Sequence, residues 1–251
     1  MAHPDDRKEF EAARRASSLS LGQDKEAFEA SVQAILAADK HRYAYLWSFM
    51  GVPIIQLPAD VMALQEAIWA TKPDVIVETG VARGGSVIFS AAMLSLIGKG
   101  TVIGVDIDIR AHNRDSIESH PMSSRIKLIE GSSVAEDTFA RVKASIPVGA
   151  SVMVVLDSDH SFQHVYDELL LYSQIVTPGQ YLIVADTLLG YLTKEQTPQE
   201  RSHVWHPGNE PLTAVRKFLE TSRDFEPDAE MNGKLILSAS VGGYLRRKGQ
   251  G

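Results

Sequence analysis

The stretch that decides the fold is "DVIVETGVARGGS", which runs from Asp74 to Ser86. Apolar, mostly β-branched residues lead into Glu78 and Gly80, and a Gly-Gly-Ser then opens an apolar segment with helical spacing. In α/β proteins a buried strand, a glycine turn and a helix start commonly hold the phosphate or carboxylate group of a cofactor. We therefore expect a cofactor at this turn.

The chain beyond Pro73 alternates short apolar runs with helical patterns. The runs are "VIVET", "TVIGVDID", "IKLIEGSS", "SVMVVLD" and "QYLIVAD". Strands that are apolar throughout and separated by helices predict a parallel sheet covered on both faces. We expect one doubly wound α/β domain over residues 58–251. Near its end, "KLILSA" (residues 234–239) and "VGGYLRR" (residues 241–247) flank a short glycine-bearing turn, which predicts an antiparallel pair for the last two strands.

Residues 1–57 predict a helical extension in front of this domain. Apolar residues recur at helical spacing after Asp24. They are followed by an aromatic cluster of Tyr43, Tyr45, Trp47 and Phe49. Two interpretations remain open: the cluster packs on the core, or it forms a lid or a contact between subunits. We expect a homo-oligomer.

Composition excludes several classes of function. The chain has 25 basic and 32 acidic residues, a net charge of -7 and no long basic run, so nucleic acid is not an expected partner. It has no cysteine, which excludes thiolate nucleophiles and leaves oxygen and histidine as the metal ligands. The N-terminus has no apolar signal core and no run reaches the ~18 apolar residues of a membrane span. We expect a cytoplasmic protein with no membrane partner.

An acidic residue stands at or near the end of every predicted strand. These acids are Glu78, Asp106, Glu130, Asp157 and Asp186. Ligands of open parallel sheets bind outside the carboxyl ends of the strands, and ionised acids near a core are costly unless something pairs with them. The pattern therefore predicts a cationic ligand at this edge of the sheet.

The spacing of the glycines and acids favours S-adenosylmethionine as the cofactor. The dinucleotide fingerprint G-x-G-x-x-G fails at its second glycine, where Ala82 stands. Asp106 lies 26 residues after Gly80, where an acid accepts hydrogen bonds from ribose hydroxyls in NAD and adenosyl cofactors alike. Glu78 precedes the glycine turn and suits a cationic group, such as the ammonium of S-adenosylmethionine.

A second group of acids predicts a cation beside the cofactor. Asp157 and Asp159 follow one strand and Asp186 ends its neighbour, so we expect their carboxylates to converge. Like charges that lie this close require a cation or a proton, and Mg²⁺ or Ca²⁺ suits oxygen ligands. The alternative is that Asp159 caps the following helix and Asp186 caps a loop. Asp159 also remains a candidate general base, together with His160.

These motifs together resemble the small-molecule methyltransferases grouped with the cephalosporin hydroxylase (CmcI-like) proteins and the rhamnosyl O-methyltransferases. The resemblance runs from "FMGVPIIQLP" through "VETGVARGGS", "VDIDIR" and "DSDHSFQHVYDEL" to "GGYLRR", about four fifths of the chain. It implies a class I methyltransferase fold with a Rossmann-like sheet and a divalent metal beside the methyl group. The cofactor-binding residues that it implies are Glu78, Thr79, Gly80, Ser86 and Asp106, with Ser132 and Ser133 near the adenine.

The chain departs from the family pattern at one position. Where the family often has an acid pair on the fifth strand, this chain has Ala185 and Asp186, so one metal ligand of the pattern is missing. The metal ligands expected from this chain are Asp157, Asp159 and Asp186.

The resulting hypothesis is a metal-assisted, S-adenosylmethionine-dependent O-methyltransferase. Its expected acceptor is a hydroxyl of a small natural product, with a deoxysugar or sugar nucleotide as the leading class. One alternative is a role in hydroxylation or methoxylation of a β-lactam nucleus. The other is a non-catalytic cofactor-binding or scaffold protein, which the acid cluster argues against.

A long polar insertion, residues 187–210, follows the fifth strand. It carries Tyr191, His203, Trp205 and His206. Loops of this length in compact domains are commonly functional or disordered. We expect it to wall the acceptor pocket, with an interface or a surface loop as the alternative.

Overall fold

The computed structural model describes residues 5–197 and 204–249. Within them, a seven-stranded sheet has the order β5-β4-β3-β6-β7-β9-β8. Five strands are parallel, and β9 runs antiparallel to both of its neighbours. The strands of this sheet are β3 (Val75–Thr79), β4 (Thr101–Asp106), β5 (Ile126–Glu130), β6 (Val152–Leu156), β7 (Tyr181–Val184), β8 (Phe225–Pro227) and β9 (Tyr244–Arg247).

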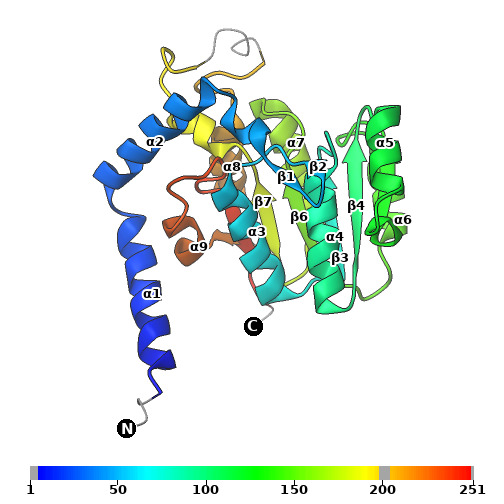
Figure 1. Cartoon of the computed structure of the whole chain (residues 1–251), viewed down its shortest axis with the longest axis horizontal. Coiled ribbons are helices and arrows are strands. Elements are labelled where there is room, and N and C mark those ends of the chain that lie inside the picture. The colour runs from blue at the N-terminus through cyan, green and yellow to red at the C-terminus, as the bar shows by residue number, and fades with distance from the viewer. Residues whose placement is uncertain (1–4, 198–203, 250–251) are drawn as a thin grey trace.

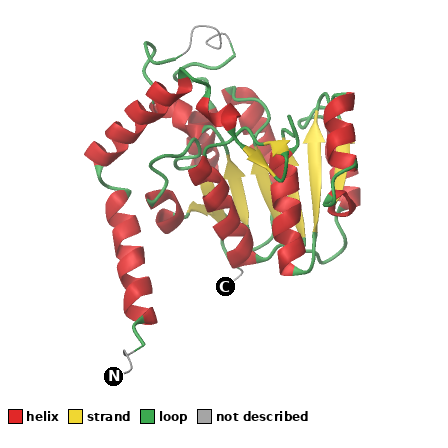
Figure 2. Ribbon diagram, in the orientation of Figure 1, coloured by secondary structure: helices red, strands yellow, loops and turns green. Residues whose placement is uncertain are grey.

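Helices cover both faces of the sheet (Figure 2). One face is packed by α3 (Pro58–Thr71), α4 (Gly85–Ile97) and α5 (Ala111–Glu118), which share one core cluster with the sheet. The other face is packed by α6 (Glu136–Ser145), α7 (Phe162–Tyr172) and α8 (Pro211–Thr221). This is the doubly wound α/β fold that the alternation of apolar runs and helical patterns predicts, in the class I methyltransferase form that the family resemblance implies.

The strand β3 shows why the apolar runs become central strands. Successive side chains of a strand point to opposite faces, so a strand covered on both sides must be apolar at every position. Ile76 enters the core on the α4 side, whereas Val75 and Val77 enter the core on the α7 side. All five residues of β3 are buried.

The register of the parallel strands brings their carboxyl ends to one edge. Thr79, the last residue of β3, pairs with Val105 of β4 and Leu156 of β6. Asp106 and Asp157 follow directly. In Figure 1 the arrowheads of β4 and β6 point to this edge, and the chain between α2 (Lys25–Asp39) and β2 (Val52–Pro53) passes over it.

The end of the sheet differs from the sequence-based prediction in one element. The antiparallel last pair is confirmed, but its strands are β8 and β9, with Phe225 opposite Arg247. The predicted strand "KLILSA" is wrong: residues 234–239 form an irregular segment. Leu235 is buried, and the Ala239 N–H donates to Asp60 at 2.9 Å. An irregular segment that buries one apolar side chain can have the same composition as a short edge strand. Composition alone therefore could not distinguish a strand from an irregular segment at residues 234–239.

The N-terminal residues form α1 (Arg7–Leu21), α2, a 3₁₀ helix η1 (Tyr43–Leu46) and a small hairpin of β1 (Ser48–Phe49) and β2. Phe49 packs edge-to-face on Phe89 of α4. Tyr45 and Trp47 are 43% and 39% exposed, so the cluster divides between the core and the surface. The helix α1 extends away from the body in Figure 1 and contacts it at α9 (Ala229–Gly233).

No helix in the described ranges combines the length and the apolar composition that crossing a membrane requires.

Candidate functional site

A pocket of ≈ 360 Å³ lies at the carboxyl edge of the sheet. Its floor is the turn after β3 together with the ends of β6 and β7. Its walls come from α2 and η1 on one side and from the insertion after β7 on the other. The pocket therefore brings together the glycine turn and the carboxylates of Asp157 and Asp186. It also includes the N-terminal aromatic segment and the insertion after β7, for which the sequence predicts a lid and an acceptor wall.

The glycine turn between β3 and α4 is held tightly against β6. Gly80 has φ +88°, and a Cβ built there would lie 1.9 Å from the Asp157 carbonyl oxygen. Only a residue without a side chain fits both the conformation and the space. The Asp157 N–H also donates to the Thr79 carbonyl at 3.0 Å. The cofactor turn and the chain that carries Asp157 are therefore in direct backbone contact.

Glu78 lies buried beneath this turn. Its side chain is 1% exposed, and Oε1 accepts a hydrogen bond from Ser86 Oγ at the start of α4. Oε2 has no hydrogen-bond partner in the described part of the chain. Burial raises the pKa of Glu78 to about 7, which the Ser86 hydrogen bond only partly offsets. A buried carboxylate oxygen without a partner is costly, and a cationic group would remove that cost.

Thr79 and Asp106 hold the backbone around the turn. Thr79 is fully buried at the end of β3. Asp106 Oδ2 accepts from the Val81 and Ala82 N–H groups at 2.8 and 3.0 Å, and Oδ1 accepts from the Asp108 N–H at 3.1 Å. A carboxylate has about four acceptor positions, so room for a ribose hydroxyl remains. Asp106 thus shapes the turn in addition to the ribose role predicted for it.

The residues predicted near the adenine follow β5. Ser132 is half-buried and Ser133 is 5% exposed. Ser133 Oγ lies 3.0 Å from His164 Nε2 on α7. His164 also lies 3.6 Å from the buried carboxylate of Glu168, and this interaction, the largest cause, raises the pKa of His164.

Glu168 links these residues to the loop after β6. Its Oε1 accepts from Ser158 Oγ at 2.7 Å. The segment that carries Asp157 is therefore tied through α7 to the segment that carries Ser133. The sequence analysis missed Glu168. The available signal was an acid inside the apolar stripe of α7 formed by Val165, Leu169 and Tyr172.

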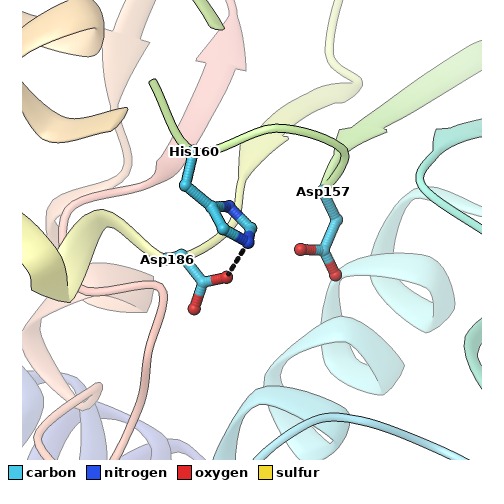
Figure 3. A group of neighbouring side chains, drawn as sticks. All are labelled: Asp157, His160 and Asp186. Atoms are coloured by element: carbon cyan, nitrogen blue, oxygen red, sulfur yellow. Dashed lines mark ion pairs between the residues drawn. The ribbon is translucent and has the colours of Figure 1, made fainter. Parts of the chain in front are cut away.

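Asp157, His160 and Asp186 converge at the pocket floor (Figure 3). One ligand atom from each lies within 4.8 Å of the others. His160 Nε2 is 3.2 Å from Asp186 Oδ2. Asp186 has φ +54°, an uncommon conformation for a residue other than glycine, at the turn between β7 and the 3₁₀ helix η3 (Thr187–Tyr191).

Further acids crowd this group and favour its protonated form. Burial, then the nearby charges of Asp186 and Glu78, raises the pKa of Asp157 well above its ordinary value. Asp60, which the sequence analysis also missed, lines the same pocket from α3 and has its pKa raised by burial to about 6. An acid in the first turn of a helix is commonplace, so nothing in the sequence singled out Asp60.

Asp159 is turned away from this group. Its Oδ1 accepts from the Ser161 N–H at 2.7 Å, directly before α7. Burial raises the pKa of Asp159, but its hydrogen bonds with Ser161 outweigh that effect and lower it overall. Of the three carboxylates that the sequence predicts to converge, the structure brings Asp157 and Asp186 together and places His160 beside them.

The insertion contributes the apolar wall of the pocket. Trp205 is 4% exposed, and it lines the pocket together with Leu188, Leu189 and Leu192. Tyr191 packs edge-to-face on Phe28 of α2. His206 is exposed, and His203 lies outside the described residues.

Comparison with known proteins agrees with this geometry. Residues 41–248 match the family described as Rhamnosyl O-methyltransferase/CmcI. A rhamnosyl O-methyltransferase of Mycobacterium leprae is 27% identical over 225 residues, which cover 85% of this chain and 91% of the relative.

Solved structures share the fold at lower identity. A CmcI structure described as containing Mg and SAM matches with a TM-score of 0.55 and 19% identity, over 81% of this chain and 77% of its own. The O-methyltransferase TomG of Streptomyces achromogenes, in complex with SAM, matches with a TM-score of 0.52 and 18% identity, over 80% of this chain and 81% of its own.

The match over residues 41–248 and the sheet order together lead to one assignment. The chain belongs to the Rhamnosyl O-methyltransferase/CmcI family and is an S-adenosylmethionine-dependent O-methyltransferase.

Proposed function

We propose that this enzyme methylates a hydroxyl of a deoxysugar, of rhamnosyl type, in a small natural product. The observation that carries the proposal is the position of Asp157 and Asp186 beside the glycine turn, on the floor of a pocket with an aromatic and aliphatic wall. Methyl transfer is an in-line displacement, so the acceptor hydroxyl must be aligned with the sulfonium and must lose its proton.

The cofactor is proposed to lie with its aminoacyl end at the glycine turn. Glu78 Oε2 is the buried acceptor that lacks a partner, and it suits the ammonium group. Ser86 lies in the first turn of α4, where a carboxylate is favoured by the positive end of the helix dipole. Asp106 is proposed to accept from the ribose hydroxyls, with Ser132 and Ser133 beside the adenine.

A divalent cation fits the pocket floor. Asp157 and Asp186 offer carboxylate oxygens at ligand spacing, and a cation between them would relieve the repulsion that a proton on Asp157 otherwise relieves. Such a cation supplies one chemical effect, which is to lower the pKa of an acceptor hydroxyl beside it. Of the two candidate bases, His160 lines the pocket, whereas Asp159 Oδ1 is engaged by the Ser161 N–H.

The charges in the pocket favour a neutral acceptor over a sugar nucleotide. The acids that line it are Asp39, Asp60, Asp157 and Asp186, whereas Arg83 is the only arginine or lysine in the lining drawn from the described residues. A diphosphate would be repelled at this edge. A deoxysugar attached to an apolar aglycone matches both the charge and the leucine-lined wall.

The test is a methyl-transfer assay with labelled S-adenosylmethionine and purified enzyme. The panel contains neutral rhamnosides with apolar aglycones, sugar nucleotides and simple phenols, each with and without a chelator. We expect transfer to the rhamnosides, and a loss of turnover after chelation. Transfer to sugar nucleotides alone would overturn the proposed acceptor class, and full activity after exhaustive chelation would remove the cation from the proposal.

A further inference from the structure

Gln56 carries a buried hydrogen-bond acceptor at the edge of the pocket. It lies between β2 and α3, in the stretch "FMGVPIIQLP". Its side-chain oxygen, Oε1, is buried and has no hydrogen-bond partner in the described part of the chain. Among the buried side-chain atoms of the described residues that lack a partner, Gln56 Oε1 is the one whose residue lines the pocket.

The other end of the Gln56 amide is already engaged. Its N–H group donates a hydrogen bond to the Asp157 carboxyl group. Oε1 is therefore the end of the amide that remains for a bound molecule. A buried amide oxygen without a donor is costly, so we expect a ligand to supply that donor.

Two close backbone contacts place Gln56 beside the glycine turn. A Cβ built at Gly85, the first residue of α4, would lie 2.3 Å from the Pro53 carbonyl oxygen. In Figure 1, β2 lies beside the start of α4. Gly80 is packed equally tightly on Asp157, which is the residue that Gln56 contacts. The chain that leads to Gln56 therefore lies against the start of α4, where the aminoacyl end of the cofactor is proposed to bind.

The aminoacyl end of S-adenosylmethionine requires more than one acceptor. Its ammonium group has three N–H donors, and Glu78 Oε2 offers one buried acceptor. A neutral acceptor can satisfy a second donor without adding a charge to a pocket that several acids already line. The amide oxygen of Gln56 has this property.

We infer that Gln56 is a cofactor-binding residue whose Oε1 accepts a hydrogen bond from the ammonium group of S-adenosylmethionine. The inference rests on the proposed orientation of the cofactor, with its aminoacyl end at the glycine turn. It extends the cofactor site beyond β3 and α4 to the segment between β2 and α3.

Calorimetric titration of the full chain with two ligands isolates the ammonium group. The first ligand is S-adenosylhomocysteine, which has the amino group and no methyl group to transfer. The second is its deaminated analogue, in which hydrogen replaces the amino group. The ratio of the two dissociation constants defines the preference for the ammonium. In the native enzyme we expect a preference of about a hundredfold, because hydrogen bonds to charged groups are the strong ones.

Two substitutions of Gln56 should lower this preference about tenfold. Gln56→Met keeps the length of the side chain and removes the acceptor. Gln56→Asn keeps the amide and withdraws it by one methylene, which provides a second variant if the first does not fold. The matched control is Gln180→Met, because Gln180 Oε1 is also buried without a partner but its residue does not line the pocket. We expect the native preference in the control, and circular dichroism verifies that each variant folds.

An unchanged preference in both Gln56 variants would overturn the inference and leave a hydroxyl of the acceptor as the donor to Oε1. An equal loss of affinity for the two ligands would also overturn it, because Gln56 would then act on a part of the cofactor that both ligands share.

Glu78→Gln separates the inference from the orientation on which it rests. A preference that falls in Glu78→Gln but stays native in the Gln56 variants contradicts the inference alone. A native preference in all three variants contradicts the proposed orientation as well. None of these titrations requires methyl transfer, so the acceptor class is tested separately by the labelled cofactor.

Discussion

Glu78 shows how burial changes the chemistry of an acid at the end of a strand. An acid after an apolar run can be read as the end of a strand, yet the structure buries its carboxyl group almost completely. The burial raises its pKa to about 7. The protonation of this one side chain therefore links the stability of the fold to pH.

Glu78→Gln should flatten the dependence of stability on pH. Between pH 4.5 and about 7 the folded protein keeps the Glu78 proton and the unfolded chain loses it, so the free energy of unfolding decreases as the pH rises. The contribution is about 3 kcal/mol over this window. Urea unfolding at pH 5 and pH 8 measures it. The native enzyme should lose about that much more stability than Glu78→Gln, with exposed Glu226→Gln as the control. Equal losses in Glu78→Gln and the native enzyme would mean that the Glu78 pKa is not raised.

Asp157→Asn and Asp186→Asn should separate chemistry from cofactor binding. Each variant removes a carboxylate at the pocket floor, and the side chains proposed to bind the adenosine, Asp106 and Ser133, stay unchanged. We expect turnover to fall at least about a hundredfold, with S-adenosylmethionine affinity within about threefold of the native value. Single-turnover kinetics and calorimetry measure the two quantities. A parallel loss of both would assign these carboxylates to the cofactor instead.

Single residues also show how far the candidate site can be predicted from the sequence. Because the carboxyl ends of parallel strands meet at one edge, the convergence of Asp157 and Asp186 followed from the strand pattern alone. The directions of the Asp159 and His160 side chains could not be predicted in this way, because side chains in a turn have no regular period. One hydrogen bond, from the Ser161 N–H, directs Asp159 elsewhere and leaves His160 in its place.

At the scale of elements, the pocket is assembled from two kinds of structure. Its floor consists of strand ends whose register is fixed by the sheet. Its walls consist of η1 and the insertion after β7, which the sheet does not determine. The apolar runs predicted the five parallel strands, β3 to β7, correctly. They failed for residues 234–239 and missed β8, because a three-residue strand is too short to produce an alternating pattern.

Trp205→Phe should raise the acceptor KM slightly, and Trp205→Ala should raise it more. Trp205 is buried in the pocket wall, so truncation removes contact with the acceptor and leaves the glycine turn intact. We expect an increase of about tenfold for Trp205→Ala, equivalent to about 1.4 kcal/mol, with little change in S-adenosylmethionine affinity.

The matched control for Trp205 is Trp69→Ala, because Trp69 is 51% exposed on α3 and does not line the pocket. Steady-state kinetics with a rhamnoside acceptor provides the comparison. An unchanged KM in Trp205→Ala would place the acceptor wall at Tyr43 and Tyr45 instead.

At the scale of the whole molecule, α1 is a helix in which Ser18 is the one buried residue. Most of its residues are exposed, including Phe10 at 65%, and it meets the body where Ser18 Oγ donates to the Glu230 carbonyl. A helix with so little burial gains stability mainly from packing on a partner. This favours a subunit contact, in agreement with the expected homo-oligomer.

Deletion of residues 1–22 should convert the expected oligomer to a monomer and leave the domain folded. The deletion keeps Asp24, which caps α2 through the Ala27 N–H, and removes no residue that lines the pocket. We expect a melting temperature within a few degrees of the native value and unchanged S-adenosylmethionine affinity. Light scattering after size exclusion measures the mass, with deletion of residues 1–5 as the control. An oligomer that survives the deletion would place the contact elsewhere, and a monomeric native enzyme would make the homo-oligomer prediction wrong.

The contact between Gly80 and the Asp157 carbonyl also has a consequence for how such enzymes diverge. Because the glycine turn and the chain that carries Asp157 touch backbone to backbone, substitutions there disturb both sides of the pocket floor at once. The walls from η1 and the insertion are separate pieces of chain. New acceptor preferences can therefore arise by replacement of the walls, while selection keeps the floor nearly constant. Within this family, the set of acceptors that an enzyme methylates should therefore change quickly during evolution. The methyl-transfer reaction itself should change slowly.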